Sequence, residues 1–259
     1  MPEDLMLERS ELKYLFRSEE AGGLLRKLAN ALEDPSFRKE HHRITTVYLD
    51  RPDGSLARAA LADPNASLKL RVRAYHPPEI VRLSPWVWVE IKERRGRTSR
   101  KSRFRLHKRW LTALQRGDLH PEMALAGPDA GGLCGGAAEA VLRLREIARG
   151  PLVALGATRY RRLALEGGTP LARLTIDQEV SYYRNPLNLH PDPGALHGRV
   201  LGPPSLAHEG AIVEVKVRGA APPRWCEAAL GGREPREYSK FVALAALAQG
   251  DCAERSIER

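Results

Sequence analysis

Three short segments of the sequence place a glutamate two positions before a lysine: Glu11/Lys13, Glu90/Lys92 and Glu214/Lys216. Two of them are close copies of each other, Val89–Lys92 and Val213–Lys216. Polar and apolar residues alternate in each, which is typical of a β-strand and puts the carboxylate and the ammonium on one face. A carboxylate can ligate a hard divalent cation, and an ammonium can bind phosphate oxygens. The pairs are therefore candidates for metal-assisted phosphate chemistry, or alternatively for weak ion pairs on a solvated sheet face.

Cations are concentrated in one part of the chain. The stretch from Ser67 to Arg109 carries 14 Lys or Arg against 3 Glu and no Asp, whereas the net charge of the whole chain is +10. Three runs in it alternate with period two: Leu68–Arg73, Trp86–Lys92 and Lys101–Leu106. Neighbouring strands with cations on one face repel each other, so either water solvates every head group or an anion lies against them. The pI of about 9.8 also indicates an anionic partner such as nucleic acid, nucleotide, phosphate polymer or membrane surface.

Other segments must position these strands. Further strands are predicted at 9–14, 44–50, 157–165, 173–177 and 212–218, and helices at 18–32, 55–62, 107–115, 137–149 and 239–248. The segments 117–136 and 185–205 are rich in Gly and Pro and are predicted to be surface connections. Because charged-face strands fall in both halves and no linker divides them, we expect one domain over residues 1–259. The sharper hypothesis is that the charged faces line a closed barrel or tunnel.

Composition limits the class of protein. An apolar fraction of 42% and a charged fraction of 29% over 259 residues are those of a globular chain. The three cysteines, Cys134, Cys226 and Cys252, have no zinc spacing and are expected to be reduced thiols. The first residues are too charged for a signal peptide, and the longest apolar runs are too short to span a bilayer. The sequence therefore predicts a cytoplasmic protein.

Several motifs, taken in order, resemble those of the VTC domain, the catalytic domain of the vacuolar-transporter-chaperone polyphosphate polymerases, within the triphosphate tunnel metalloenzymes. The motifs are Glu11–Tyr14, Lys69–Arg73, Glu90–Lys92, Lys101–Phe104, Tyr160–Arg162, Thr175–Asp177, Glu214–Lys216 and Ser239–Phe241. The resemblance implies an α+β fold, an antiparallel β-barrel or tunnel with a charged lumen and flanking helices. It also implies cleavage of a nucleotide's terminal phosphoanhydride and, in the polymerases, transfer to a growing polyphosphate.

The resemblance assigns roles residue by residue. The catalytic residues that it implies are Arg71, Arg73, Arg162 and Lys92. The substrate-binding residues that it implies are Lys13, Lys69, Lys101, Arg103, Tyr160, Lys216 and Lys240. Glu214 is implied as the ligand of Mn²⁺ or Mg²⁺, with Glu11 and Glu90 as helpers and Asp177 as a further acid. The chain departs from the fungal polymerases at Glu237, where they carry a lysine, and this change could weaken the hold on a polymer or favour another acceptor.

The same basic strands are compatible with more than one function. Motif order favours a polymerase over a triphosphatase within the leading class, the phosphoryl-transfer enzymes of this fold. A non-catalytic binder of polyphosphate or nucleotide is the second class, and a nucleic-acid-binding protein is the third. The expected partners are ATP or another triphosphate and polyphosphate, with no nucleic acid expected and a membrane protein partner undetermined. A nucleic-acid-binding protein would use the same basic strands.

Trp88 shares a face with Glu90 and could stack on a nucleotide base, although packing is the simpler interpretation. His41 and His42 are expected to be surface residues that precede a strand.

Overall fold

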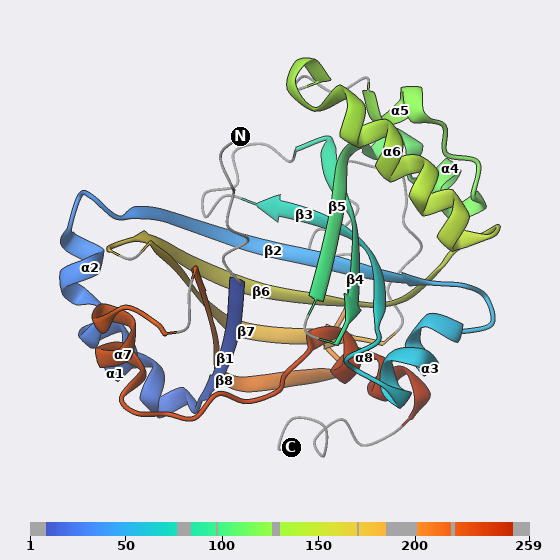
Figure 1. Ribbon diagram of the computed structural model, residues 1–259. Helices are drawn as coiled ribbons and strands as arrows, with labels where there is room; N and C mark the ends of the chain where they lie inside the picture. The colour runs from blue at the N-terminus through green and yellow to red at the C-terminus, as the bar shows by residue number, and fades with distance from the viewer. Residues whose placement is uncertain are drawn as a thin grey trace.

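The protein is built on one eight-stranded antiparallel sheet in the order β1-β8-β7-β6-β2-β3-β4-β5 (Figure 1). The computed structural model describes residues 9–76, 84–96, 98–125, 130–169, 171–184, 201–218 and 221–250, without the side chains of 9, 125 and 130–135. The strands are β1 Arg9–Phe16, β2 Arg38–Asp50, β3 Leu68–His76, β4 Trp86–Arg95, β5 Thr98–His107, β6 Val153–Gly167, β7 Ala172–Tyr183 and β8 Leu206–Arg218. The helices are α1 Ser18–Lys27, α2 Ala29–Glu33, α3 Ser55–Ala62, α4 Leu111–Arg116, α5 Pro121–Leu125, α6 Ala130–Ala148, α7 Arg224–Leu230 and α8 Lys240–Gln249, with a 3₁₀ turn at Lys108–Trp110.

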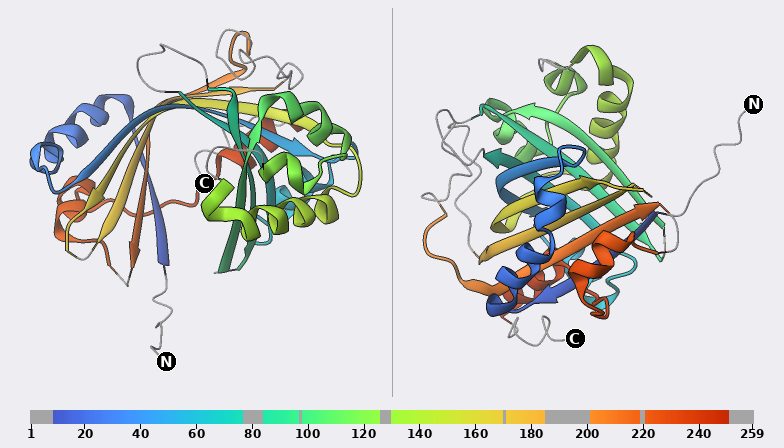
Figure 2. Two further views of the ribbon diagram at one scale, coloured as in Figure 1. Left: turned by 90° about the horizontal axis from the view of Figure 1, so that it is seen from above. Right: turned by 90° about the vertical axis from the view of Figure 1, so that its left-hand side faces the viewer.

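The sheet bends into an arch, so that its two ends face each other (Figure 2, left). Helices α1, α2 and α7 lie outside one arm, and α4, α5 and α6 lie outside the other. The two ends of the sheet come into contact through Lys92 on β4, whose Nζ lies 3.4 Å from Oε2 of Glu11 on β1. Within the described residues no backbone ladder joins β1 to β5, so the sheet is tunnel-like rather than a closed barrel. The predicted fold class, α+β with an antiparallel tunnel-like sheet and flanking helices, is confirmed.

Apolar residues cover the outer, convex face in two clusters. One cluster packs α4, α5 and α6 against β2 to β5 and includes Val72, Val89, Phe104 and Leu144. The other packs α1 and α7 against β1, β7 and β8 and includes Val213, Val215 and the buried free thiol of Cys226. Because side chains alternate along a strand, the polar residues between these positions point to the concave side, called the inner face below.

A third apolar cluster lies on the inner face and involves α8. Phe241 and Leu244 of this helix pack against Tyr48 and Tyr160 of the sheet. The helix contacts β6 and α3, and its N-cap is Ser239, whose side chain accepts a hydrogen bond from the Val242 backbone N–H. The helix therefore occupies one end of the inner face and brings its first turn toward the charged residues of the sheet.

Local predictions were correct for most strands and needed correction at several boundaries. Strand β2 begins at Arg38, so His41 and His42 lie within it instead of preceding it. The helix predicted at 18–32 is divided at Leu28 into α1 and α2. The connection predicted at 117–136 contains α5 and the start of α6, because Leu119, Ala124 and neighbouring apolar residues pack against the sheet. Most of the connection predicted at 185–205 lies outside the described residues. Within the described part of the chain, no helix is long and apolar enough to cross a membrane.

Candidate functional site

The centre of the inner face is an ion cluster around Glu90 on β4. The Glu90 side chain is 0% exposed, and its Oε2 lies 2.7 Å from Arg71 Nε and 3.8 Å from Arg73 Nη1. Its other oxygen contacts the Lys101 ammonium. Burial opposes ionisation of Glu90, but the three cations outweigh burial and hold its pKa well below the usual range. Glu90 therefore stays ionised and holds cations from β3 and β5 in one place.

A second cluster forms around Asp177 on β7. Arg162 donates two hydrogen bonds to this carboxylate, Nε to Oδ1 at 2.6 Å and Nη2 to Oδ2 at 2.7 Å. Lys240, the first residue of α8, donates to Oδ2 at 2.7 Å. The side chain of Asp177 is 2% exposed, and its pKa is lowered because Lys240 and Arg162 outweigh the effect of burial. Both cations also lie over the ring of Tyr160, at 5.3 and 4.9 Å from its centroid. Asp177 thus fixes the orientation of the two predicted phosphate-binding cations.

A third cluster combines two carboxylates of neighbouring strands, Glu11 on β1 and Glu214 on β8. Lys13 Nζ lies 3.2 Å from Glu11 Oε1, and Lys216 contacts Glu214. In the register, Glu11 stands opposite Lys216 and Lys13 opposite Glu214, so the two carboxylates are diagonal neighbours. Burial raises the pKa of both acids, but the neighbouring cations lower it by more. The pKa of each acid therefore lies below its ordinary value, and both stay ionised. Their side chains are 29% and 17% exposed, more than those of Glu90 and Asp177.

The chemistry of this third cluster suits a divalent cation shared with a phosphate. In the described residues, no group of three or more His, Cys, Asp or Glu side chains could hold a metal ion. A complete protein cage is therefore absent from this part of the molecule. However, Mg²⁺ is commonly held by one or two carboxylates together with substrate phosphates. Glu11 and Glu214 fit that requirement.

Two predicted cations have no acid partner within the described chain. The Lys69 ammonium donates to Ser239 Oγ at 3.0 Å and lies 5.8 Å from the Phe241 ring centroid. Burial, together with the nearby charges of Lys13 and Lys92, lowers the pKa of Lys69 to about 7. Arg103 on β5 lies over the ring of Trp88, with its guanidinium carbon 4.5 Å from the centroid.

All fifteen residues predicted from the sequence lie on the inner face or point to it from α8. Twelve are named in the three clusters above, Lys92 contacts Glu11 of the third cluster, and Lys69 and Arg103 complete the set. Sequence reasoning missed Thr46, which is buried and accepts a hydrogen bond from Arg73 Nε at 3.1 Å. It also missed the backbone carbonyl of Tyr238, which accepts from Lys13 Nζ at 2.9 Å. The alternation of the β2 strand could have identified Thr46, whereas no sequence signal marks the carbonyl.

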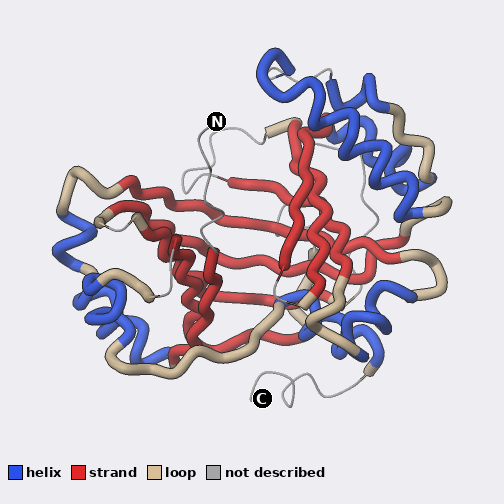
Figure 3. The backbone as a smooth tube through the Cα atoms, viewed as in Figure 1, coloured by secondary structure: helices blue, strands red, loops and turns tan. Residues whose placement is uncertain are grey.

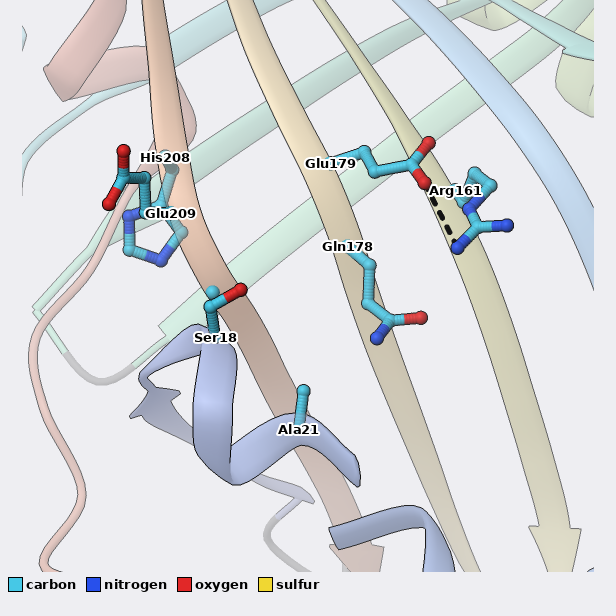
Figure 4. Close-up of a pocket in the computed structure, with 8 residues that line it drawn as sticks. Ser18, Ala21, Arg161, Gln178, Glu179, His208 and Glu209 are labelled. Carbon is cyan, nitrogen blue, oxygen red and sulfur yellow. Dashed lines mark ion pairs between the residues drawn. The ribbon is translucent and has the colours of Figure 1, made fainter. Parts of the chain in front are cut away.

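A pocket away from the inner face lies beside the start of α1 (Figure 4). Arg161, Glu179 and Glu209 are among its lining residues. Arg161 is paired with Glu179, Nη2 to Oε1 at 3.0 Å, and Glu209 adds a second acid. This pocket has no excess of cations, so it is not a candidate for binding a phosphate chain.

The fold and the inner face define a class of protein whose antiparallel sheet is tunnel-like and carries charged side chains on its concave side. The chain belongs to the VTC domain family, because the family's sequence profile, described as VTC domain, matches residues 8–248. The resemblance inferred from the motifs is confirmed. Family membership and the inner face together support an enzyme that transfers phosphoryl groups from triphosphates with a divalent metal ion.

Further comparisons give a loose structural likeness. No curated protein matches the chain. A structure from Hippeastrum, described as a candidate adenylyl cyclase that reveals a dominant triphosphatase activity, is 16% identical, with 93% of this chain and 95% of that chain covered and a TM-score of 0.45. A candidate adenylate cyclase from Vibrio parahaemolyticus is 11% identical, with 91% and 97% covered and a TM-score of 0.43. A protein from Pyrococcus horikoshii OT3 is 12% identical, with 93% and 99% covered and a TM-score of 0.44.

Proposed function

We propose that this protein synthesises polyphosphate, by transferring the terminal phosphoryl group of ATP or another nucleoside triphosphate to a growing phosphate chain. The observation that carries the proposal is the composition of the inner face, where cations from β1, β3, β4, β5, β6, β8 and α8 outnumber the carboxylates. Such a face binds a linear polyanion in preference to a neutral substrate. We also propose that residues 1–259 act as one domain, because a single sheet takes strands from both halves of the chain.

The cations next to the buried acids are assigned to the transferring group. The charge that develops during transfer is stabilised by Arg71 and Arg73 on β3 and by Arg162 on β6. Lys92 on β4 assists them. Glu90 and Asp177 hold these guanidinium groups in position before a ligand arrives, which reduces the entropy lost on binding. The remaining predicted residues bind flanking phosphates or pack beside them: Lys13, Lys69, Lys101, Arg103, Tyr160, Lys216 and Lys240.

The metal site is assigned to Glu214, with Glu11 as its neighbour. A bound Mn²⁺ or Mg²⁺ would neutralise phosphate oxygens and align the triphosphate. Lys13 and Lys216, which now pair with these carboxylates, would then be available to phosphate oxygens. Glu90, the third predicted metal carboxylate, has cations against both of its oxygens, so its main contribution in this arrangement is to orient Arg71, Arg73 and Lys101.

No protein nucleophile is needed, because the attacking group is an oxygen of the phosphate chain end. If water attacks instead, the same site acts as a triphosphatase, and this is the second candidate function. One observation favours it. Glu237, at the position where the fungal polymerases carry a lysine, is 72% exposed and, among the described residues, pairs with Arg94 alone, Oε1 to Nη2 at 3.7 Å. A negative charge near the end of the inner face would weaken the hold on a long polyanion.

The decisive experiment is incubation with ATP and Mn²⁺ or Mg²⁺, followed by gel electrophoresis and phosphorus NMR of the products. Polymer is the expected product, free phosphate indicates the triphosphatase, and binding of ATP without any product contradicts an enzymatic function. Arg71→Ala and Arg162→Ala should each lower turnover by about 100-fold or more, because each removes a donor that stabilises the transition state.

The matched control for these variants is Arg100→Ala on β5. Arg100 is next to Lys101 in the sequence but pairs with Glu139 on the outer side, and both side chains are about 70% exposed. Its replacement should leave turnover unchanged. Unchanged turnover in Arg71→Ala and Arg162→Ala as well would show that the inner face is not the active site.

A further inference from the structure

Trp88 is an aromatic residue beside the ion cluster of Glu90, outside the apolar cluster around α8, and Trp86 lies on the same face two positions earlier along β4. Trp88 stands two positions from Glu90 on β4, and its register partners are Arg73 on β3 and Arg105 on β5. It is half-buried and belongs to none of the three apolar clusters. In contrast, Trp110 and Trp225 pack against the clusters of the outer face. Packing in a core therefore does not explain the indole of Trp88.

The partner of Trp88 is also unusual. Arg103 is exposed and, within the described chain, makes no ion pair with an acid, whereas Arg71, Arg73 and Arg162 all do. Its guanidinium group instead lies over the Trp88 ring, at 4.5 Å from the guanidinium carbon to the centroid. An indole and a planar guanidinium group are both surfaces on which a nucleobase can stack.

The register places this pair in line with the phosphate-binding residues. Along β4, Trp88 is followed on the same face by Glu90, with Arg71 opposite, and then by Lys92, with Lys69 opposite. Each step of two residues advances about 7 Å along the strand. A nucleoside triphosphate lying along β4 with its base at Trp88 would therefore bring its phosphates to the cluster around Glu90.

We propose that Trp88 and Arg103 form a nucleobase subsite, so that the protein binds nucleoside triphosphates more tightly than inorganic tripolyphosphate. The proposal rests on the proposed function, because it places the phosphates of the same ligand on the inner face. Stacking uses the π-face that every base has, and a guanidinium group that lies over an aromatic ring offers a base its plane rather than its N–H edge. The subsite therefore selects for the presence of a base and discriminates little between adenine and guanine.

The test is calorimetric titration of the full chain with ATP, GTP and inorganic tripolyphosphate, in wild type and in Trp88→Leu. Leucine keeps apolar bulk but removes the π-face. The ratio of the Kd for ATP to the Kd for tripolyphosphate should rise about 10-fold in Trp88→Leu, and the ratio for GTP should rise equally. Trp88→Phe, which keeps an aromatic ring, should restore most of the wild-type ratio.

Each outcome of the titration bears on one proposal. An unchanged ratio in Trp88→Leu, with all ligands still bound, overturns the subsite and leaves the proposed function intact. A change for ATP without a change for GTP also overturns it, because stacking alone cannot distinguish them to that extent. If wild type binds neither ATP nor tripolyphosphate, the proposed function itself fails. If Trp88→Leu does not fold, the ratio is measured in Trp88→Tyr and Trp88→Met, and equal ratios in these two variants overturn the subsite.

Discussion

Two buried acids keep the cations of the inner face in place. Glu90 and Asp177 are almost completely enclosed, and each contacts cations from other strands or from α8. Removing water from such charges is costly, and the cost is offset only where geometry and hydrogen bonds are good. The two carboxylates therefore serve mainly to hold Arg71, Arg162 and Lys240 in a fixed geometry, rather than to add stability by themselves.

Lys69 should make phosphate binding depend on pH near neutrality. Its ammonium faces the charges of Lys13, Lys92, Arg71 and Arg94 as well as the Ser239 hydroxyl, and burial with these cations lowers its pKa to about 7. Below this pH Lys69 is charged, and above it the positive charge is lost. The Kd of tripolyphosphate should therefore rise by up to about 10-fold as the pH is raised from 6 to 8. Calorimetric titration across this range measures the change.

The control for this prediction is Lys69→Arg. Arginine stays charged over the whole range, so the remaining pH dependence of this variant comes from the phosphate ligand and other groups. The wild-type dependence should be steeper. Equal dependence in both proteins would show that Lys69 does not titrate in this range.

Among the elements, α8 ties together strands that lie far apart in the sheet. Ser239, its N-cap, accepts from Lys69 on β3, and Lys240 donates to Asp177 on β7. Just before the helix, the Arg236 backbone N–H donates to the carbonyl of Lys13 on β1 at 2.7 Å. A displacement of α8 would therefore disturb several phosphate-binding side chains at once.

Gly156 on β6 provides a way to displace α8. A Cβ at this position would lie 2.7 Å from Leu244 Cδ1 and 2.9 Å from the Tyr183 carbonyl oxygen. Gly156→Ala should lower the free energy of unfolding by about 1–3 kcal/mol, because the helix must shift in a well-packed region. Turnover of ATP should fall as well. Urea denaturation and the product assay measure the two effects.

Gly136 on α6 is the matched control. A Cβ there meets nothing within 4 Å. Alanine also favours a helix over glycine by up to about 1 kcal/mol, so Gly136→Ala should be neutral or stabilising and fully active. Full activity and stability in Gly156→Ala would mean that the position of α8 does not matter for the site.

At the scale of the whole molecule, curvature converts a basic sheet into a polyanion site. The bend brings β1 beside β4, as the contact between Glu11 and Lys92 shows, and helices cover the convex side (Figures 2 and 3). Like charges on the inner face repel each other while no anion is bound. A bound polyanion should therefore stabilise the folded state.

Tripolyphosphate should raise the Tm by about 5–10 °C at a concentration near 100 times its Kd. The increase should become smaller as salt is added, because binding is electrostatic. A thermal melt in the presence of each ligand checks this. A short DNA or RNA duplex at equal phosphate concentration serves as the comparison. A larger shift with the duplex, not reversed by tripolyphosphate, would favour the nucleic-acid-binding alternative.

The sequence alone determined the period of each charged strand, the face that carries the charges and the order of the family's motifs. These are local properties, since side-chain direction in a strand follows from position along the chain. The tertiary structure decided which strands are neighbours, how far the sheet bends and what α8 covers. The acid that Arg162 and Lys240 share, the contact of Lys92 with Glu11 and the stacking of Arg103 on Trp88 all depend on pairing between distant segments. Register and twist set these contacts, and neither is encoded in a local period.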